Sequence, residues 1–143
     1  MPEKKNKTKQ LIKVVVDTNI LVSSQICAKG CPSEIVTLIR VNKLQPYYNA
    51  EIMNEYNRVL RYPRLQIASR EISVIVNLIL RKGVAMETEK SAIEMTDESD
   101  RKFYDLHKAA NAILITGNIR HFPKENTIMK PADFMFFFEN SAK

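Results

Sequence analysis

Apolar and polar positions along the chain predict strands and helices that follow one another. The run at 11–16, "LIKVVV", is rich in β-branched residues and predicts a buried first strand. Further strands are predicted at 44–48, 84–87 and 112–116. Apolar residues three and four positions apart predict helices at about 19–28, 33–42, 50–61, 71–81, 97–111 and 131–140. The segment at 71–81 is β-branched enough that a strand is an alternative there.

Residues at the predicted helix ends support these boundaries. Asn49 and Asp97 are suitable N-cap residues, and Gly83 is a suitable C-cap. Pro63 ends one helix and Pro131 begins another. Strands that alternate with helices indicate an α/β fold with a central, mainly parallel sheet of about 4–5 strands. In such a sheet, binding sites form beyond the carboxyl ends of the strands.

Length and charge refine this fold. The 143 residues fit a single domain, expected at 10–138 between a disordered basic tail at 1–9 and a short C-terminal tail at 139–143. Of the net charge of +6, the first ten residues supply +3 (four Lys against one Glu), as a solubilising tail or an RNA contact. Basic residues gather at 57–82 and acidic residues at 87–105. Clustered carboxylates repel a polyanion unless a cation lies between them.

Several classes of protein do not fit the sequence. Cys27 and Cys31 lack the further cysteines or paired histidines of a zinc site, so they are expected to be free thiols. The chain has no glycine-rich phosphate loop and no GxSxG motif. No apolar run reaches the ~20 residues of a membrane span, and the lysine-rich start lacks the apolar core of a secretory signal. A cytoplasmic location with no membrane contact is therefore expected.

Five polar residues lie on or near the predicted carboxyl edge of the sheet. They are Asp17, Glu55, Asp97, Asp100 and Asn118. Taken singly, each has a structural interpretation: Asp17, Asp97 and Asp100 as residues that favour helix N-termini, Glu55 as a solvated helix residue, and Asn118 as a turn residue. Taken together, they indicate a cleft whose carboxylates would repel one another unless Mg²⁺ or Mn²⁺ bound there. Such an ion beside a basic surface suits phosphodiester hydrolysis.

Three segments resemble a known family. They are "VVVDTNILVSS", "EIMNEYNRVLRYPRL" and "DESDRKFYDLHKAANAILITGNIRHFP". In this order they resemble a PIN domain (PilT N-terminus) over about residues 11–137, and more narrowly the toxin components of bacterial PIN-family toxin–antitoxin systems. The resemblance implies a PIN-like three-layer α/β/α fold and a metal-dependent endoribonuclease.

The resemblance also implies roles for the acidic residues. Asp17, Glu55 and Asp100 correspond to the metal-binding acids, and Asp100 lies eighteen residues before Asn118, as the family spacing requires. Asn118 takes the fourth catalytic position. Asp97 is either an additional metal ligand or only the helix cap. The reaction implied is in-line attack of activated water on phosphorus, which leaves a 5′-phosphate and a 3′-hydroxyl.

Further residues are expected to support the site or contact RNA. Those that would orient carboxylates or hold metal-bound water are Thr18, Asn19 and Thr116. The candidates for RNA contact are Arg58, Arg61 and Arg64, which could equally form a solvated helix face or dock an acidic partner.

Four residues have uncertain or unusual places in this scheme. Because Asn118 is neutral, one metal would bind tightly and a second only with RNA present. His107 is expected at the surface, with reach toward the site as the alternative, and Asp105 on the solvated side of the same helix. His121 has no assigned chemistry and is interpreted as a loop-packing residue.

The toxin resemblance implies partners besides RNA. A cognate antitoxin protein and a homodimer are expected, and the aromatic run "FMFFF" at 134–138 is expected to pack mostly into the core while offering part of such a surface. The competing hypothesis is a non-catalytic PIN-like domain that binds RNA or protein.

Overall fold

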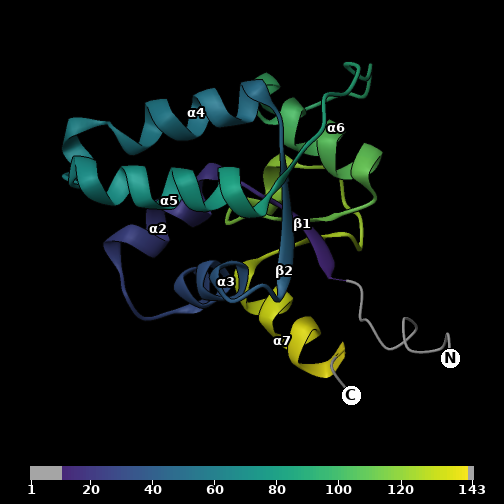
Figure 1. Cartoon of the computed structure of the whole chain (residues 1–143). Helices are drawn as coiled ribbons and strands as arrows, with labels where there is room; N and C mark the ends of the chain where they lie inside the picture. The colour runs from purple at the N-terminus through teal and green to yellow at the C-terminus, as the bar shows by residue number, and fades with distance from the viewer. Residues whose placement is uncertain (1–10, 142–143) are drawn as a thin grey trace, which may run out of the picture.

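Figure 1 shows the computed structural model, which describes residues 11–141. Within these residues the chain forms five strands: β1 (Ile12–Val16), β2 (Leu44–Tyr48), β3 (Val84–Ala85), β4 (Ile113–Ile115) and β5 (Ile128–Met129). It also forms six α-helices: α2 (Thr18–Ile26), α3 (Cys31–Arg40), α4 (Ala50–Leu60), α5 (Ser69–Lys82), α6 (Arg101–Ala110) and α7 (Pro131–Ser141). Three short 3-10 helices lie between them: η1 (Pro63–Leu65), η2 (Glu98–Asp100) and η3 (Ile119–His121). The tail predicted at 1–9 lies outside the described residues, and α7 continues beyond residue 138.

The five described strands are all parallel and lie in the order β3-β2-β1-β4-β5. The predicted parallel sheet is confirmed, with one strand, β5, that the sequence pattern did not predict. Strand order reverses at β1, which has β2 on one side and β4 on the other, with Val16 paired with Ile115. A crevice forms at such a reversal, beyond the carboxyl ends of the two diverging strands.

Helices cover both faces of this sheet. The connections from β1 to β2 and from β3 to β4 run in opposite directions along the sheet, so right-handed crossovers place their helices on opposite faces. Accordingly α3 and α5 pack on β2, whereas α6 packs on β1, β2 and β4. Helices α4 and α5 form a hairpin whose arms lie side by side (Figure 1). The predicted three-layer α/β/α fold is therefore confirmed.

The predicted helix ends are largely confirmed. Asn49 caps α4, because its Oδ1 accepts a hydrogen bond from the Ile52 backbone N–H at 2.9 Å. The segment at 71–81 is helical, which settles the alternative between helix and strand. Gly83 ends α5 with φ −95°, so no left-handed turn requires glycine. A Cβ atom at Gly83 would instead lie 2.5 Å from the Ile79 carbonyl oxygen, so close backbone approach excludes a side chain.

Two predictions about α6 are wrong. His107 is 1% exposed rather than on the surface, and its ring does not reach the predicted site. Its Nδ1 lies 2.7 Å from the Tyr104 carbonyl oxygen and its Nε2 lies 3.1 Å from Thr127 Oγ1. Asp105 is 8% exposed rather than solvated, because the chain before α6 covers it and the Ser91 N–H donates to its carboxylate at 3.0 Å. Helix α6 is therefore buried not only along its apolar side but also at the positions of Asp105 and His107.

The aromatic run in α7 divides between core and surface. Phe134 is fully buried, whereas Phe136 is 70% exposed and Phe137 is 36% exposed. Helix α7 packs on α3, which explains why only one side of the run is covered.

Two other sequence expectations concern cysteines and membranes. Cys27 and Cys31 are free thiols, as predicted. Across residues 11–141, no helix combines the length and the apolar character needed to span a bilayer.

Candidate active-site cleft

Asp17 lies at the carboxyl end of β1 and is 5% exposed. Its backbone N–H donates to the Ile115 carbonyl oxygen at 2.9 Å, which joins the ends of β1 and β4. Its Oδ2 accepts a hydrogen bond from Thr116 Oγ1 at 2.7 Å. Asp17 occupies the N-cap position of α2, as its structural interpretation predicted, but its side chain makes no capping hydrogen bond there. The carboxylate is instead fixed where the strand order reverses.

Glu55 reaches the same place from α4. Its Oε2 accepts a hydrogen bond from Thr18 Oγ1 at 2.6 Å, and its Oε1 lies 2.8 Å from Lys102 Nζ. The next residue, Tyr56, is buried and donates from its hydroxyl to the Val16 carbonyl oxygen at 2.6 Å. That bond ties α4 to the end of β1, so the Glu55 carboxylate has little freedom to move away from the crevice.

Lys102, which lines the neighbouring hollow along α6, is a partner of Glu55 that the sequence pattern did not reveal. Its side chain is only 9% exposed, and its ammonium group contacts both Glu55 and the Ser99 carbonyl oxygen. The ammonium also lies 5.3 Å from the centre of the Phe103 ring. A usable signal was present, because a lysine in the first turn of a helix faces the positive end of the helix dipole and needs an acidic partner nearby.

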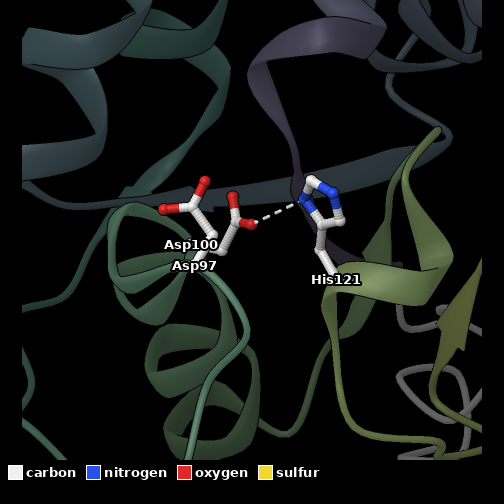
Figure 2. Close-up of side chains that lie close together, drawn as sticks. All are labelled: Asp97, Asp100 and His121. Atoms are coloured by element: carbon white, nitrogen blue, oxygen red, sulfur yellow. Dashed lines mark hydrogen bonds and ion pairs between the residues drawn. The ribbon is translucent and has the colours of Figure 1, made fainter.

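Asp97, Asp100 and His121 form a second group in the cleft (Figure 2). His121 Nδ1 lies 3.3 Å from Asp100 Oδ2. One ligand atom from each of the three residues lies within 4.8 Å of the others. Asp97 also caps η2, because its Oδ1 accepts a hydrogen bond from the Ser99 N–H at 3.0 Å. The cap predicted at Asp97 is confirmed, and the residue still lines the cleft.

The loop after β4 completes the crevice. The Asn118 backbone N–H donates to Thr116 Oγ1 at 3.0 Å, so one hydroxyl connects this loop with Asp17. Asn19 Oδ1 accepts a hydrogen bond from the Gly117 N–H at 3.2 Å, which holds the loop against α2. Thr116 therefore orients a carboxylate directly, whereas Asn19 positions the loop that carries Asn118.

The predicted residues meet in one cleft of about 300 Å³. Its lining consists of Asp17, Thr18, Asn19, Val22, Glu55, Val59, Arg64, Leu65, Asp97, Asp100, Asn118 and His121. Two larger hollows, of about 440 and 470 Å³, lie along α6 and contain neither Asp17 nor Glu55. The smaller cleft is therefore distinguished not by its size but by its place beyond the carboxyl ends of β1 and β4, where the strand order reverses.

The three predicted arginines do not share one position. Arg64 lines the cleft. Arg58 is exposed on α4 and lies 4.0 Å from Glu55, at the limit of an ion pair. Arg61 hydrogen-bonds to Asn57 on its own helix at 2.8 Å. Of the three arginines, only Arg64 thus lines the cleft itself.

Comparison with known proteins connects this geometry with a family. The family model described as PIN domain matches residues 13–120. The chain belongs to the PIN domain family. It is also 31% identical over 119 residues to a protein of Methanocaldococcus jannaschii that is described only as uncharacterised, an alignment that covers 81% of this chain and 76% of that protein.

Burial and mutual repulsion perturb the carboxyl groups of this PIN domain. Burial, together with the charges of Asp100 and Glu55, raises the pKa of Asp17 from 3.8 to about 6. Burial and the neighbouring Asp97 likewise raise the pKa of Asp100. By contrast, hydrogen bonds from Ser99 lower the pKa of Asp97. The two raised pKa values therefore reflect burial first and the repulsion between neighbouring acids second.

A divalent cation fits this donor set. The PIN domain presents carboxylate oxygens from β1, α4 and the η2–α6 junction, which are the ligands that Mg²⁺ and Mn²⁺ take in proteins. Bound there, a cation would relieve the repulsion that raises the pKa of Asp17 and Asp100.

Proposed function

We propose that this PIN domain, a nuclease-type fold, is a metal-dependent endoribonuclease that hydrolyses RNA phosphodiester bonds. The observation that carries the proposal is the convergence of four carboxylates on one cleft at the reversal of strand order, with the pKa of the buried Asp17 raised to about 6. A domain that only bound RNA would gain nothing from acids that repel both one another and a polyanion.

Asp17, Glu55 and Asp100 would hold Mg²⁺ or Mn²⁺, with Asp97 as an additional ligand. A bound ion of this kind activates water and neutralises negative charge that grows on the phosphate during attack. Thr116 holds the Asp17 carboxylate at 2.7 Å and Thr18 holds that of Glu55 at 2.6 Å, so both acids are oriented before an ion binds.

Other polar groups would position the substrate. Asn118, which follows β4 at the rim of the cleft, would assist through its neutral amide without adding to the repulsion. Arg64 lines the cleft and would contact the phosphate backbone, with Arg58 and Arg61 further along the same basic segment. Hydrolysis in this arrangement would leave a 5′-phosphate and a 3′-hydroxyl.

The role of a toxin in a toxin–antitoxin pair is the finer part of the proposal, and it rests on the resemblance of the three sequence segments. A cognate antitoxin would block the cleft, and the exposed Phe136 and Phe137 on α7 would contribute to an antitoxin or homodimer surface. Such an enzyme would act on RNA in the cytoplasm. Rescue of growth by one co-expressed neighbouring gene, after the nuclease alone arrests it, would support this role.

A non-catalytic PIN-like binding domain is the second candidate, and the Lys102–Glu55 ion pair favours it. The ammonium group at 2.8 Å already neutralises one acid without any metal, as a metal-free scaffold would require. The raised pKa values of Asp17 and Asp100 weigh against this candidate, since Lys102 leaves their repulsion unrelieved.

RNA cleavage by purified protein distinguishes the two candidates. We expect cleavage with Mn²⁺, none with EDTA, and none by Asp17→Asn. Cleavage that survives EDTA and Asp17→Asn would reject the proposed mechanism. Asp133→Asn is the matched control, because it removes an exposed acid on α7 away from the cleft and should leave the rate unchanged.

A further inference from the structure

His121 lies in the cleft although nothing in the sequence gave it a chemical role. It ends η3, which begins directly after Asn118, and it faces the start of α6 across the crevice (Figure 2). We infer that His121 is a metal ligand together with Asp97 and Asp100, and that its imidazole makes the cleft prefer Mn²⁺ to Mg²⁺. This inference rests on the proposed metal-dependent function and specifies which ion serves it.

The geometry is close to that of a coordination shell. Neighbouring ligands of an octahedral ion with bonds of ~2.1 Å lie ~3.0 Å apart, and opposite ligands lie ~4.2 Å apart. His121 Nδ1 and Asp100 Oδ2 are 3.3 Å apart, which suits neighbouring positions. The ligand atoms of all three residues lie within 4.8 Å of one another, so Asp97 needs to move by at most ~2 Å.

The ligand atoms of these residues have few competing partners: an ion would replace the hydrogen bond between His121 Nδ1 and Asp100 Oδ2. Both hydrogen bonds from Ser99 go to Oδ1 of Asp97, so within the described part of the chain Oδ2 is left for an ion. Glu55 is less available, because Thr18 and Lys102 occupy its two oxygens. A first ion would therefore meet less competition at Asp97, Asp100 and His121 than beside Glu55.

Short, anchored elements hold His121 in this position. Its backbone N–H donates to the Asn118 carbonyl oxygen at 3.0 Å, and the next residue, Phe122, is 7% exposed and packs in the core. Asp100 lies at the junction of η2 with α6. The approach of the imidazole to Asp100 is thus built into the fold rather than left to a long loop.

The ligand type determines the expected ion. Mg²⁺ takes oxygen ligands almost exclusively and keeps several waters, so an imidazole contributes little to its binding. Imidazole nitrogen suits first-row transition ions better, and Mn²⁺ accepts it alongside carboxylates. A mixed site of two carboxylates and one imidazole therefore favours Mn²⁺ over Mg²⁺ in a way that a site of carboxylates alone does not.

Binding measured without RNA tests the inference. By calorimetry on untagged protein, we expect His121→Ala to weaken Mn²⁺ binding by about tenfold or more, and Mg²⁺ binding by less than about threefold. His121→Asn, which offers an oxygen in place of nitrogen, should move the preference toward Mg²⁺. The control is Arg120→Ala, which removes an exposed neighbour of His121 and should change neither affinity.

Pulsed electron paramagnetic resonance of the Mn²⁺-loaded protein gives a direct signature. We expect an imidazole ¹⁴N coupling in the wild type that is lost in His121→Ala. The assignment is unambiguous because the sequence contains only two histidines, and His107 is buried with both ring nitrogens already in contact. Absence of this coupling, or equal loss of Mn²⁺ and Mg²⁺ affinity in His121→Ala, would overturn the inference and reduce His121 to a hydrogen-bond partner of Asp100.

Failure of the inference and failure of the proposed function give different results. Cleavage of RNA by wild type with either ion, without any ¹⁴N coupling, would leave the nuclease proposal intact and remove His121 from the ligands. A clear ¹⁴N coupling with no cleavage of any RNA would support the metal site and reject the nuclease.

Discussion

Replacing Asp17 with asparagine should stabilise the metal-free protein while removing one carboxylate from its proposed metal site. Asp17 is 5% exposed and lies among like charges, so its ionised form is held at a cost in the folded state. Asparagine keeps an oxygen to accept the hydrogen bond from Thr116 Oγ1 and carries no charge. The substitution therefore removes the cost and retains the contact.

The magnitude follows from the shift in pKa. Asp17 titrates at about 6 in the folded protein against an ordinary value of 3.8. Well below pH 3.8 Asp17 is protonated in both the folded and the unfolded chain, so it does not change the free energy of unfolding. As pH rises from 4 to 6 the folded state holds the proton longer, so folding loses about 3 kcal/mol of stability, at ~1.4 kcal/mol for each pKa unit. Above pH 6 the loss is complete, and Asp17→Asn avoids it.

Urea denaturation of metal-free protein at two pH values measures this effect. We expect Asp17→Asn to exceed the wild type in free energy of unfolding by about 2–3 kcal/mol at pH 7.5, and to match it near pH 4. With saturating Mn²⁺ the order at pH 7.5 should reverse, because the wild type keeps the Asp17 carboxylate and gains more from binding. Asp133→Asn, an exposed acid, should show no such difference. A metal-free Asp17→Asn that is less stable than wild type at pH 7.5 would refute the reasoning.

Three further predictions test the surroundings of the cleft. Lys102→Met should destabilise the metal-free protein by about 3 kcal/mol in urea denaturation, because it leaves Glu55 without its buried partner. Mn²⁺ should restore part of this loss, and Lys124→Met, which changes an exposed lysine, is the control. Thr116→Val should weaken Mn²⁺ binding by about tenfold in calorimetry, because Asp17 loses the hydroxyl that orients it, whereas the exposed Thr37→Val should not. Phe134→Ala should cost about 3–5 kcal/mol of stability in urea denaturation, and Phe136→Ala, which is 70% exposed in wild type, less than about 0.5 kcal/mol.

Local sequence patterns predicted most of the strands and helices of the fold. The run at 11–16 is apolar on both faces, which identifies a central parallel strand, and the helix at 50–61 carries both its cap and its apolar stripe in sequence. Strand β5 escaped prediction because its two residues, Ile128 and Met129, are too few to show any period. It pairs with β4 only because the fold brings the two together.

The acids of the cleft could be found from sequence because each has a local sign. Asp17 follows a buried strand, and Asp97 and Asp100 open a helix. Arrangement along a parallel sheet then predicts that they meet. His121 had no comparable sign, since its role depends on Asp100, which packing brings near. Lys102 had only its place in the first turn of a helix, which indicates an acidic partner without identifying it as Glu55 on α4.

The errors at Asp105 and His107 have the same physical origin. A helix with one apolar stripe is expected to expose its other side, so polar residues there are assigned to solvent. In this fold the chain before α6 covers Asp105 through the Ser91 N–H, and the chain just before β5 covers His107 through Thr127. A segment without periodicity gives no indication in sequence that it will cover a helix.

The carboxylates of the cleft outnumber the cationic groups beside them. Which carboxylate has a cationic partner and which has none indicates how metal binding is coupled to folding. Lys102 neutralises Glu55, and His121 lies beside Asp100, whereas the donors to Asp17 within the described residues are neutral: the Thr116 hydroxyl and the Thr18 backbone. Asp17 is also the most buried of these acids and the one whose pKa rises to about 6. A divalent ion would therefore stabilise the fold chiefly through the charge of Asp17, and the protein should be most dependent on metal at the pH where that acid is ionised.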